Sequence, residues 1–141
     1  LVRNICFKQA NLKMTDRLDE LGGAMLGDIL LEPTRIYVRS IVKLLNQYRV
    51  KHIVHGMAHI TGGGLLGNIP RVLPENCNAV IKKSSWPVPK IFTFLQSKGP
   101  VEEKEMFRVF NMGIGFVLIV AEDFANSIQK KLTSKWFRCL T

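Results

Sequence analysis

The chain has 141 residues, of which 47% are hydrophobic, a size and composition that fit one domain, or half of a larger enzyme, with a sizeable core. Three scattered cysteines without a C-x-x-C pair argue against a disulfide framework or a zinc knuckle, and no apolar run approaches the roughly 18 residues that cross a bilayer. The net charge of +9 is spread over both halves without a basic stripe, so it favours a solvated surface first, small phosphorylated ligands second and nucleic acid third.

The first part of the chain is predicted to contain two helices and one strand. Residues 1–10 fit a short helix, whereas residues 11–23 are polar and indicate a loop or a frayed helix. Pro33 ends any helix that precedes it. The β-branched and aromatic residues 35–38, RIYV, predict a strand, and the apolar spacing over residues 41–48 predicts a helix.

The middle of the chain is predicted to form two strands around a glycine turn. Residues 52–60, HIVHGMAHI, are typical of a strand, and residues 62–64 are three consecutive glycines. Residues 65–69 predict a short helix, which Pro70 ends. A third strand is expected at residues 78–83, NAVIKK.

The last part of the chain is predicted to contain three helices and the remaining strands. Residues 90–99 and the acidic-started residues 101–110 each predict a helix. Residues 113–121, GIGFVLIVA, are apolar throughout and predict a strand buried on both faces. A helix is expected at residues 122–132 and a closing strand at residues 136–140. Alternating strands and helices imply an α/β layered structure.

The glycine triplet is the strongest local signal. Glycine costs about 1 kcal/mol per residue against alanine in a helix, so three in a row indicate a tight turn or a backbone that approaches a ligand closely. Strand, glycines and short helix together form the geometry of an anion site, in which backbone amides converge on one oxyanion. A tight turn with close helix–strand packing is an equally good interpretation of the pattern alone.

Two better-known glycine motifs fit less well. No lysine followed by serine or threonine comes after the glycines, as a P-loop requires. Gly62, Gly64 and Gly67 match G-x-G-x-x-G, but the acidic residue expected about 20 positions later is replaced by Lys82 and Lys83. A dinucleotide site is therefore disfavoured.

The histidines and carboxylates give weaker signals. His55 and His59 lie four apart in a predicted strand without a third ligand nearby, which favours a structural or ligand-contacting histidine over zinc. Asn111 and Gly113 precede the last long strand, where a bulge is favoured over a ligand contact. The acidic residues at 102–105 are typical of a solvated face and not of a general acid–base pair.

Four segments resemble, in order and spacing, the aminoimidazole ribonucleotide synthetases, also called phosphoribosylformylglycinamidine cyclo-ligases. They are EPTRIYV, AHITGGGLLGNIPRVLP, SWPVPKIFTFLQ and FNMGIGFVLIV, and the resemblance runs from residue 1 to about residue 132. It implies that residues 1–141 are a single C-terminal domain with a mixed β-sheet and helices packed mainly on one face. The N-terminal domain, which binds ATP and metal in the family, is expected to lie outside this sequence, which begins without methionine. Family members usually carry glutamate where this chain has Gly67, and the ending SKWFRCLT also departs from the family pattern.

The resemblance implies an ATP-driven ring closure in purine biosynthesis, carried out in the cytoplasm by a full-length homodimer. Formylglycinamidine ribonucleotide would become aminoimidazole ribonucleotide, with ATP and Mg²⁺ bound in the full-length enzyme and the metal ligands outside this chain. The isolated chain is expected to be inactive. The alternative is a stand-alone phosphate- or nucleotide-binding module without catalysis. Neither nucleic acid nor a membrane is an expected partner.

The resemblance and the glycine pattern together give a set of candidate site residues. The glycines are expected to donate backbone amides to a phosphate, Thr61 a hydroxyl, and His59 a polar contact as the one candidate catalytic side chain. Arg35, Asn68 and Arg71 are candidates for charge or positioning, while Asn111 and Gly113 are expected to shape the opposite wall. Structural alternatives are a turn cap for Thr61 or Asn111 and an ion pair for Arg71. The phosphate-binding set is Thr61, Gly62, Gly63, Gly64, Asn68, Arg71, Arg35, Asn111 and Gly113.

Overall fold

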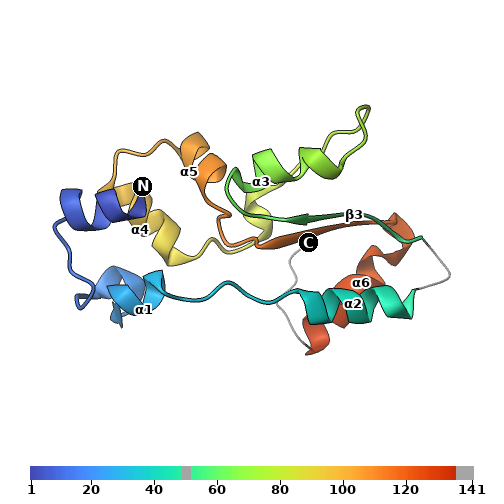
Figure 1. Cartoon of the computed structure of the whole chain (residues 1–141), viewed down its shortest axis with the longest axis horizontal. Coiled ribbons are helices and arrows are strands. Elements are labelled where there is room, and N and C mark those ends of the chain that lie inside the picture. The colour runs from blue at the N-terminus through green and yellow to red at the C-terminus, as the bar shows by residue number, and fades with distance from the viewer. Residues whose placement is uncertain (49–51, 136–141) are drawn as a thin grey trace.

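A computed structural model describes residues 1–48 and 52–135 (Figure 1). Helices are combined with two small antiparallel sheets, each of two strands within these residues, so the predicted layered helix-and-strand class is confirmed. The molecule is elongated: the N-terminal helix, α1 and α4 gather at one end, and a long pair of antiparallel strands with α2 and α6 forms the other. No helix in the described ranges is both long and apolar enough to cross a membrane.

The N-terminal end contains short elements. The helix predicted at residues 1–10 is present, mostly as a π-helix, η1. The segment predicted as a loop or frayed helix instead contains a short strand and a 3₁₀ turn, because the glycine pair Gly22 and Gly23 reverses the chain with positive φ angles of 77° and 75° and lets two strands pair. The elements are η1 (Asn4–Gln9), β1 (Arg17–Leu18), η2 (Asp19–Leu21), β2 (Ala24–Met25) and α1 (Leu26–Leu30).

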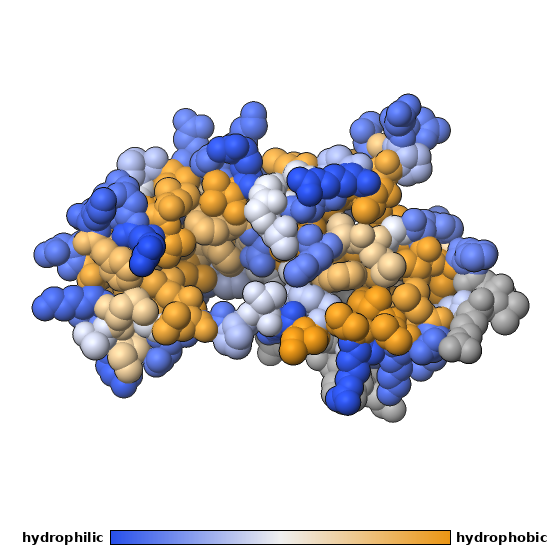
Figure 2. Space-filling view, viewed as in Figure 1, coloured by the Kyte–Doolittle hydropathy of each residue, from blue (hydrophilic) through white to orange (hydrophobic). Residues whose placement is uncertain are grey.

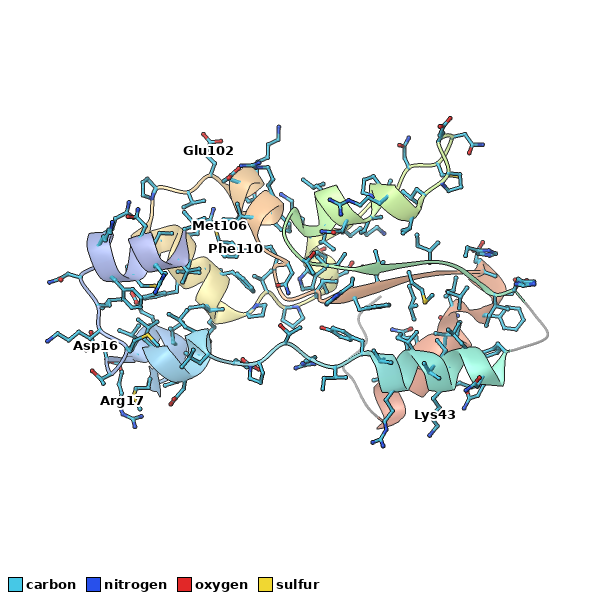
Figure 3. All side chains as sticks on the ribbon, in the orientation of Figure 1. Asp16, Arg17, Lys43, Glu102, Met106 and Phe110 are labelled. Carbon is cyan, nitrogen blue, oxygen red and sulfur yellow. The ribbon has the colours of Figure 1, made fainter. Side chains whose placement is uncertain are left out.

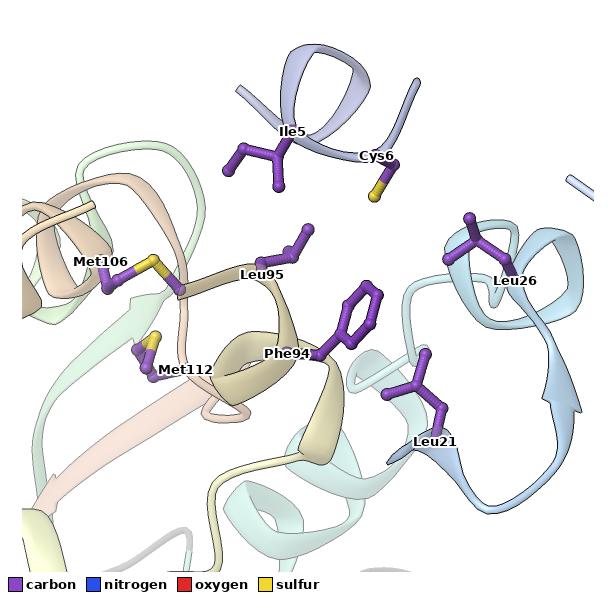
Figure 4. Packing of buried hydrophobic residues seen from close by; sticks show 8 residues of the cluster. All are labelled: Ile5, Cys6, Leu21, Leu26, Phe94, Leu95, Met106 and Met112. Atoms are coloured by element: carbon purple, nitrogen blue, oxygen red, sulfur yellow. The ribbon is translucent and has the colours of Figure 1, made fainter. Parts of the chain in front are cut away.

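Two predicted helices, α4 (Lys90–Lys98) and α5 (Glu103–Val109), complete the core at this end. Glu102 projects outward at the start of α5, whereas Met106 and Phe110 lie on its inner side (Figure 3). Figure 4 shows the buried cluster that joins α4 and α5 to the N-terminal elements. Its members are Ile5, Cys6, Leu21, Leu26, Phe94, Leu95, Met106 and Met112.

The other end is built on two paired antiparallel strands, β3 (Val54–His59) and β4 (Phe116–Val120), which confirms both predicted strands. This pair of strands is called the hairpin, although residues 60–115 separate its strands in the sequence. Met57 pairs with Leu118, and a bulge interrupts the register between Val54 and Gly56. The prediction that β4 is buried on both faces is wrong, because all five of its residues are only half-buried. Within the described residues β4 has one neighbouring strand, so its other edge is not covered by a strand.

Both faces of the hairpin carry helices. α2 (Val38–Gln47) and α6 (Glu122–Lys135) lie together on one side of it (Figure 1), and Leu44, Ile53 and Ile128 form the buried centre of that contact. On the opposite face, α3 (Gly64–Asn68) and η3 (Pro70–Val72) bring Leu65 and Ile69 against Ala58 and Trp86. The hairpin is therefore the middle layer of this end.

The apolar surface of α2 is broader than the area that the hairpin covers. Figure 2 shows apolar atoms gathered over this helix on the viewed face. Val38, Val42 and Leu45 recur at helical spacing and are exposed, while Ser40 and Leu44 are buried. One apolar row of α2 thus faces the core and a second row faces outward.

Two predicted strands are absent. Residues 35–37 have no regular structure and Val38 begins α2, while residues 78–82 are irregular and a short 3₁₀ turn, η4 (Lys83–Ser85), follows. Both segments have β-branched residues, but no described strand pairs with either, and Val80 is 90% exposed. Strand preference depends on cross-strand neighbours more than on the backbone itself. The closing strand predicted at residues 136–140 lies outside the described residues.

The buried cluster of Figure 4 predicts a large stability difference between two identical substitutions. Leu95→Ala should lower the free energy of unfolding by about 2–5 kcal/mol, because Leu95 is 1% exposed and its removal leaves a cavity. Leu31→Ala is the matched control, since Leu31 is 73% exposed, and should change it by less than about 0.5 kcal/mol. Urea unfolding followed by circular dichroism measures both. Equal effects would contradict the position of Leu95 in the core.

The described cysteines should differ in reactivity. Burial raises the pKa of the Cys6 thiol and removes it from solvent, whereas Cys77 is exposed. Because the thiolate is the reactive form, iodoacetamide should alkylate Cys77 in the folded chain and Cys6 only after unfolding. Peptide mapping by mass spectrometry measures this difference, and labelling of Cys6 at the rate of Cys77 in the native chain would contradict it.

Candidate functional site

The turn between β3 and α3 lies directly against the connection from α5 to β4. The amide of Ile60 donates to the carbonyl of Gly115 (2.9 Å) at one side of this contact. At the other side, a Cβ on Gly64 would overlap the carbonyl oxygen of Phe107 and lie 2.8 Å from that of Phe110. Both ends of residues 60–64 are therefore in contact with residues 107–115.

The three glycines of the turn differ in what the protein itself requires of them. Gly63 and Gly64 have φ angles of 96° and 60°, which are left-handed conformations that favour glycine, and Gly64 also lacks room for a Cβ. Gly62 is exposed, its φ lies outside the left-handed region, and a Cβ there would meet no atom within 4 Å. Neither conformation nor packing within the described chain explains why residue 62 is glycine.

The backbone amides of the turn also divide into two kinds. The amide of Gly64 donates to the carbonyl of Thr61 (3.0 Å) and that of Gly67 to the carbonyl of Gly63 (2.9 Å). For the amides of Gly62 and Gly63, residues 1–48 and 52–135 provide no hydrogen-bond acceptor. Of the three predicted backbone donors, Gly64 is thus engaged within the turn, and Gly62 and Gly63 remain available.

Asn68 stabilises the turn from inside. Its side chain is buried, and its amide nitrogen donates to the carbonyls of Gly64 (2.7 Å), Gly62 (3.2 Å) and Thr61 (3.4 Å). The sequence suggested a role in charge or positioning, and this geometry is one of positioning: the amide fixes the carbonyl side of the turn. Thr61 itself is exposed.

His59 ends β3 immediately before this turn and belongs to a cluster of three rings. Its ring centroid lies 5.8 Å from that of Tyr37 in an edge-on arrangement and 6.1 Å from that of Phe116 in a stacked one. The rings of Tyr37 and Phe116 are 5.3 Å apart. Tyr37 was missed in the sequence, because residues 35–38 resemble a strand and nothing local places this ring beside His59.

Asn111 and Gly113 form a turn of their own in the connection to β4. The side-chain oxygen of Asn111 accepts a hydrogen bond from the amide of Gly113 (3.0 Å), and the buried indole of Trp86 donates to the carbonyl of Met112 (2.9 Å). This capping role is the structural alternative considered for Asn111. The turn stands in the segment that borders the glycines.

Arg35 and Arg71 are exposed, and no ion pair joins either to another side chain in the described part of the protein. Arg35 stands in the irregular segment before α2, and Arg71 in η3 beyond α3. No hydrogen bond or ring contact between described residues brings either side chain to the glycine turn.

The remaining chemistry-bearing groups lie apart from the turn. The acidic face predicted for α5 is solvated and paired: Glu103 contacts Lys83 (2.7 Å), and the hydrogen bond from Arg108 (2.6 Å) holds the pKa of Glu105 below its usual value. Within the described ranges, no group of three or more histidine, cysteine or acidic side chains could hold a metal ion. A surface recess of about 350 Å³ runs along α3 and residues 73–81, lined mainly by apolar side chains, and contains none of the predicted site residues.

Position 67 borders the same turn. A Cβ on Gly63 would lie 3.5 Å from the Cα of Gly67, yet a Cβ on Gly67 itself would meet no atom within 4 Å. The site is thus an exposed turn with two available amides, flanked by His59 on one side and by position 67 on the other.

Known proteins resemble this chain over most of its length. The sequence profile of the family "AIR synthase related protein, C-terminal domain" matches residues 4–135. Proteins named phosphoribosylformylglycinamidine cyclo-ligase are 51% identical in Citrifermentans bemidjiense, 49% in Desulfotalea psychrophila and 42% in Lactobacillus helveticus.

These alignments cover 94%, 91% and 96% of this chain, respectively, but only 37%, 35% and 38% of the three relatives. The chain therefore spans little more than a third of the length of the proteins that it matches. With a profile that covers nearly all of the described residues, the chain belongs to the family of AIR synthase related proteins and represents their C-terminal domain.

Proposed function

We propose that this chain is the C-terminal part of an ATP-dependent cyclo-ligase that converts formylglycinamidine ribonucleotide to aminoimidazole ribonucleotide. The names of the relatives and their identity of about half to this chain support the proposal. The chain then forms one wall of a cleft, and the preceding domain forms the other. In this proposal residues 1–141 form a single domain of that enzyme.

Gly62 carries the part of the proposal that concerns the site. It is an exposed glycine without a conformational or packing requirement in the described chain, and its amide has no acceptor there. A ligand that approaches the backbone too closely for a Cβ explains both features. Together with the amide of Gly63, it presents adjacent donors of the kind that bind phosphate oxygens.

The proposed reaction needs this kind of donor. ATP transfers its terminal phosphoryl group to the formyl amide oxygen, the amidine nitrogen attacks the activated carbon, and inorganic phosphate leaves with that oxygen. Negative charge on the transferred group is best stabilised by fixed dipoles that need no rearrangement. In this scheme Gly62 and Gly63 donate amides to a phosphate, Thr61 adds its hydroxyl and His59 makes a polar contact.

The other candidate residues have supporting places. Asn68 holds the carbonyl side of the turn, so that the amides of Gly62 and Gly63 stay turned outward. Asn111 and Gly113 shape the neighbouring turn. Gly64 allows the glycine turn to approach the carbonyls of Phe107 and Phe110 closely. Arg35 and Arg71 are proposed to reach the phosphates of the substrate from the rim of the cleft.

Mg²⁺ is proposed for the full-length enzyme only. Its ligands are proposed to lie in the preceding domain, and no step here depends on it. We further propose a cytoplasmic homodimer whose main contact also lies in that domain.

Gly62 and Gly64 provide a matched pair of alanine variants. Gly62→Ala should change the free energy of unfolding by less than about 1 kcal/mol, because its Cβ meets open space. Gly64→Ala should lower it by about 2–3 kcal/mol or more, because its Cβ overlaps a carbonyl and its φ is left-handed. Thermal unfolding compares them, and a strongly destabilised Gly62→Ala would show that residue 62 is glycine for structural reasons.

The same Gly62→Ala variant tests the ligand. In a ¹⁵N-resolved titration of the 141-residue chain with ATP and, separately, inorganic phosphate, the amide signals of Gly62 and Gly63 should shift. In the variant these shifts should be lost while the fold is kept. Shifts elsewhere, with none at these two amides, would overturn the assignment of the turn as the phosphate site.

Activity should require the preceding domain. The 141-residue chain should give no ATP-dependent aminoimidazole ribonucleotide in a steady-state assay, whereas the full-length protein should. Gly62→Ala in the full-length protein should lower kcat/KM on the order of 100-fold, since a misplacement of about 1 Å has effects of that size. Phosphate binding without activity in the full-length protein would instead support the stand-alone binding module.

A further inference from the structure

Tyr37 joins a segment distant in sequence to the end of β3. It is the last residue before α2, and its half-buried ring contacts both His59 and Phe116, with ring centroids 5.8 and 5.3 Å away. His59 is exposed and lies at the end of a strand, where a side chain with only water around it would sample several rotamers. The two aromatic neighbours restrict the orientations open to its imidazole.

The position of Tyr37 depends on a glycine. A Cβ on Gly115 would overlap the Tyr37 hydroxyl and lie 2.7 Å from Cζ of its ring, so the phenol occupies the space that any other residue at 115 would fill. Gly115 is itself fixed, because its carbonyl accepts the amide of Ile60 (2.9 Å). The ring is therefore seated on the last residue of the connection from α5 to β4.

The same seat fixes the end of the segment in which Arg35 stands. Residues 32–37 have no regular structure, and Arg35 stands two residues before Tyr37. With the Tyr37 ring held over Gly115, the segment that carries Arg35 is tied to the end of the hairpin where the glycine turn begins.

We propose that Tyr37 is a positioning residue: it holds the imidazole of His59 in one orientation beside the glycine turn, through the seat that Gly115 provides. The proposal rests on the proposed function, in which His59 contacts the substrate. In this proposal Tyr37 acts through His59 and not on the reacting atoms. Tyr37 orders the imidazole of His59 before the ligand binds. The loss of side-chain entropy on binding is therefore smaller.

Nuclear magnetic resonance of the 141-residue chain tests the orientation directly. The ring protons of His59 should show ring-current shifts from Tyr37 and Phe116. In Tyr37→Leu the His59 signals should move toward those of a free imidazole, while those of His52 and His55 stay unchanged. Tyr37→Phe should keep the native shift, and Gly115→Ala should reproduce the effect of Tyr37→Leu by displacing the ring.

Two controls separate positioning from loss of the fold. Tyr48→Leu removes a tyrosine that packs on Phe124 in the contact of α2 with α6, and should leave the His59 signals in place. The amide signals of β3 and β4 should remain dispersed in Tyr37→Leu. The proposal would be overturned if the His59 signals were unchanged in both Tyr37→Leu and Gly115→Ala. It would also be overturned if β3 and β4 unfolded in Tyr37→Leu while Gly115→Ala kept native His59 signals.

A double-mutant cycle in the full-length enzyme tests the functional consequence. Tyr37→Leu should raise KM about 2- to 10-fold, the range expected for one side chain that must be ordered on binding, and Tyr37→Phe should restore it. In a His59→Ala background, Tyr37→Leu should have no further effect. Fully additive effects would overturn the proposal while leaving the role of His59 intact, whereas normal activity of His59→Ala would overturn both that role and the functional part of this inference.

Discussion

The close approach of Gly64 to α5 is the constraint on which the rest of the site depends. A helix end can touch the carbonyls of Phe107 and Phe110 only where no Cβ stands between them. This contact sets the depth at which α3 sits, and the Ile60–Gly115 hydrogen bond sets where β3 leaves the hairpin. These two contacts are the anchors of the turn between them, which therefore has little conformational freedom.

The anchors also explain why the turn presents its amides outward. Asn68 reaches back from α3 and binds three carbonyls of the turn, so the acceptor side faces the interior. The peptide groups of Gly62 and Gly63 must then present their N–H groups on the other side. The buried side chain of Asn68 thus orients two backbone N–H groups that it does not contact. Binding loops are commonly held by a rigid support of this kind.

The hairpin itself is a weak support without its helices. A two-stranded antiparallel ribbon is at best marginally stable in water, and here the helices on both faces supply the burial that it lacks. Every residue of β4 is only half-buried, because two strands alone cover little of each other's surface. The local order of His59 and the glycine turn therefore depends on α2, α3 and α6 more than on the strand pairing.

The sequence predicted the elements that are stabilised by local signals. The helices at α4 and α5 have prolines, acidic starts and apolar spacing of their own, and β3 and β4 are long runs of strand-forming residues. The segments 35–38 and 78–83 have the same composition but no partner in the described chain, and strand formation is decided by the partner. The glycine triplet itself indicated the turn, but nothing in the sequence separated the structural Gly64 from the unconstrained Gly62.

The ring of Tyr37 and the inward amide of Asn68 were beyond prediction for a related reason. Tyr37 contacts a strand residue 22 positions later in the sequence. Asn68 was a candidate for charge or positioning, but its sequence context did not show that its side chain turns back onto the carbonyls of the turn. Contacts of this kind depend on tertiary geometry, which hydrophobic periodicity does not encode.

The open space above Gly67 allows this surface to change its charge without changing its shape. Its φ lies outside the left-handed region and no atom lies within 4 Å of a Cβ built there, so a side chain could start at this position without a clash. A charged side chain at this position would stand beside the two available amides of the turn and would change the electrostatic potential that an approaching anion meets there.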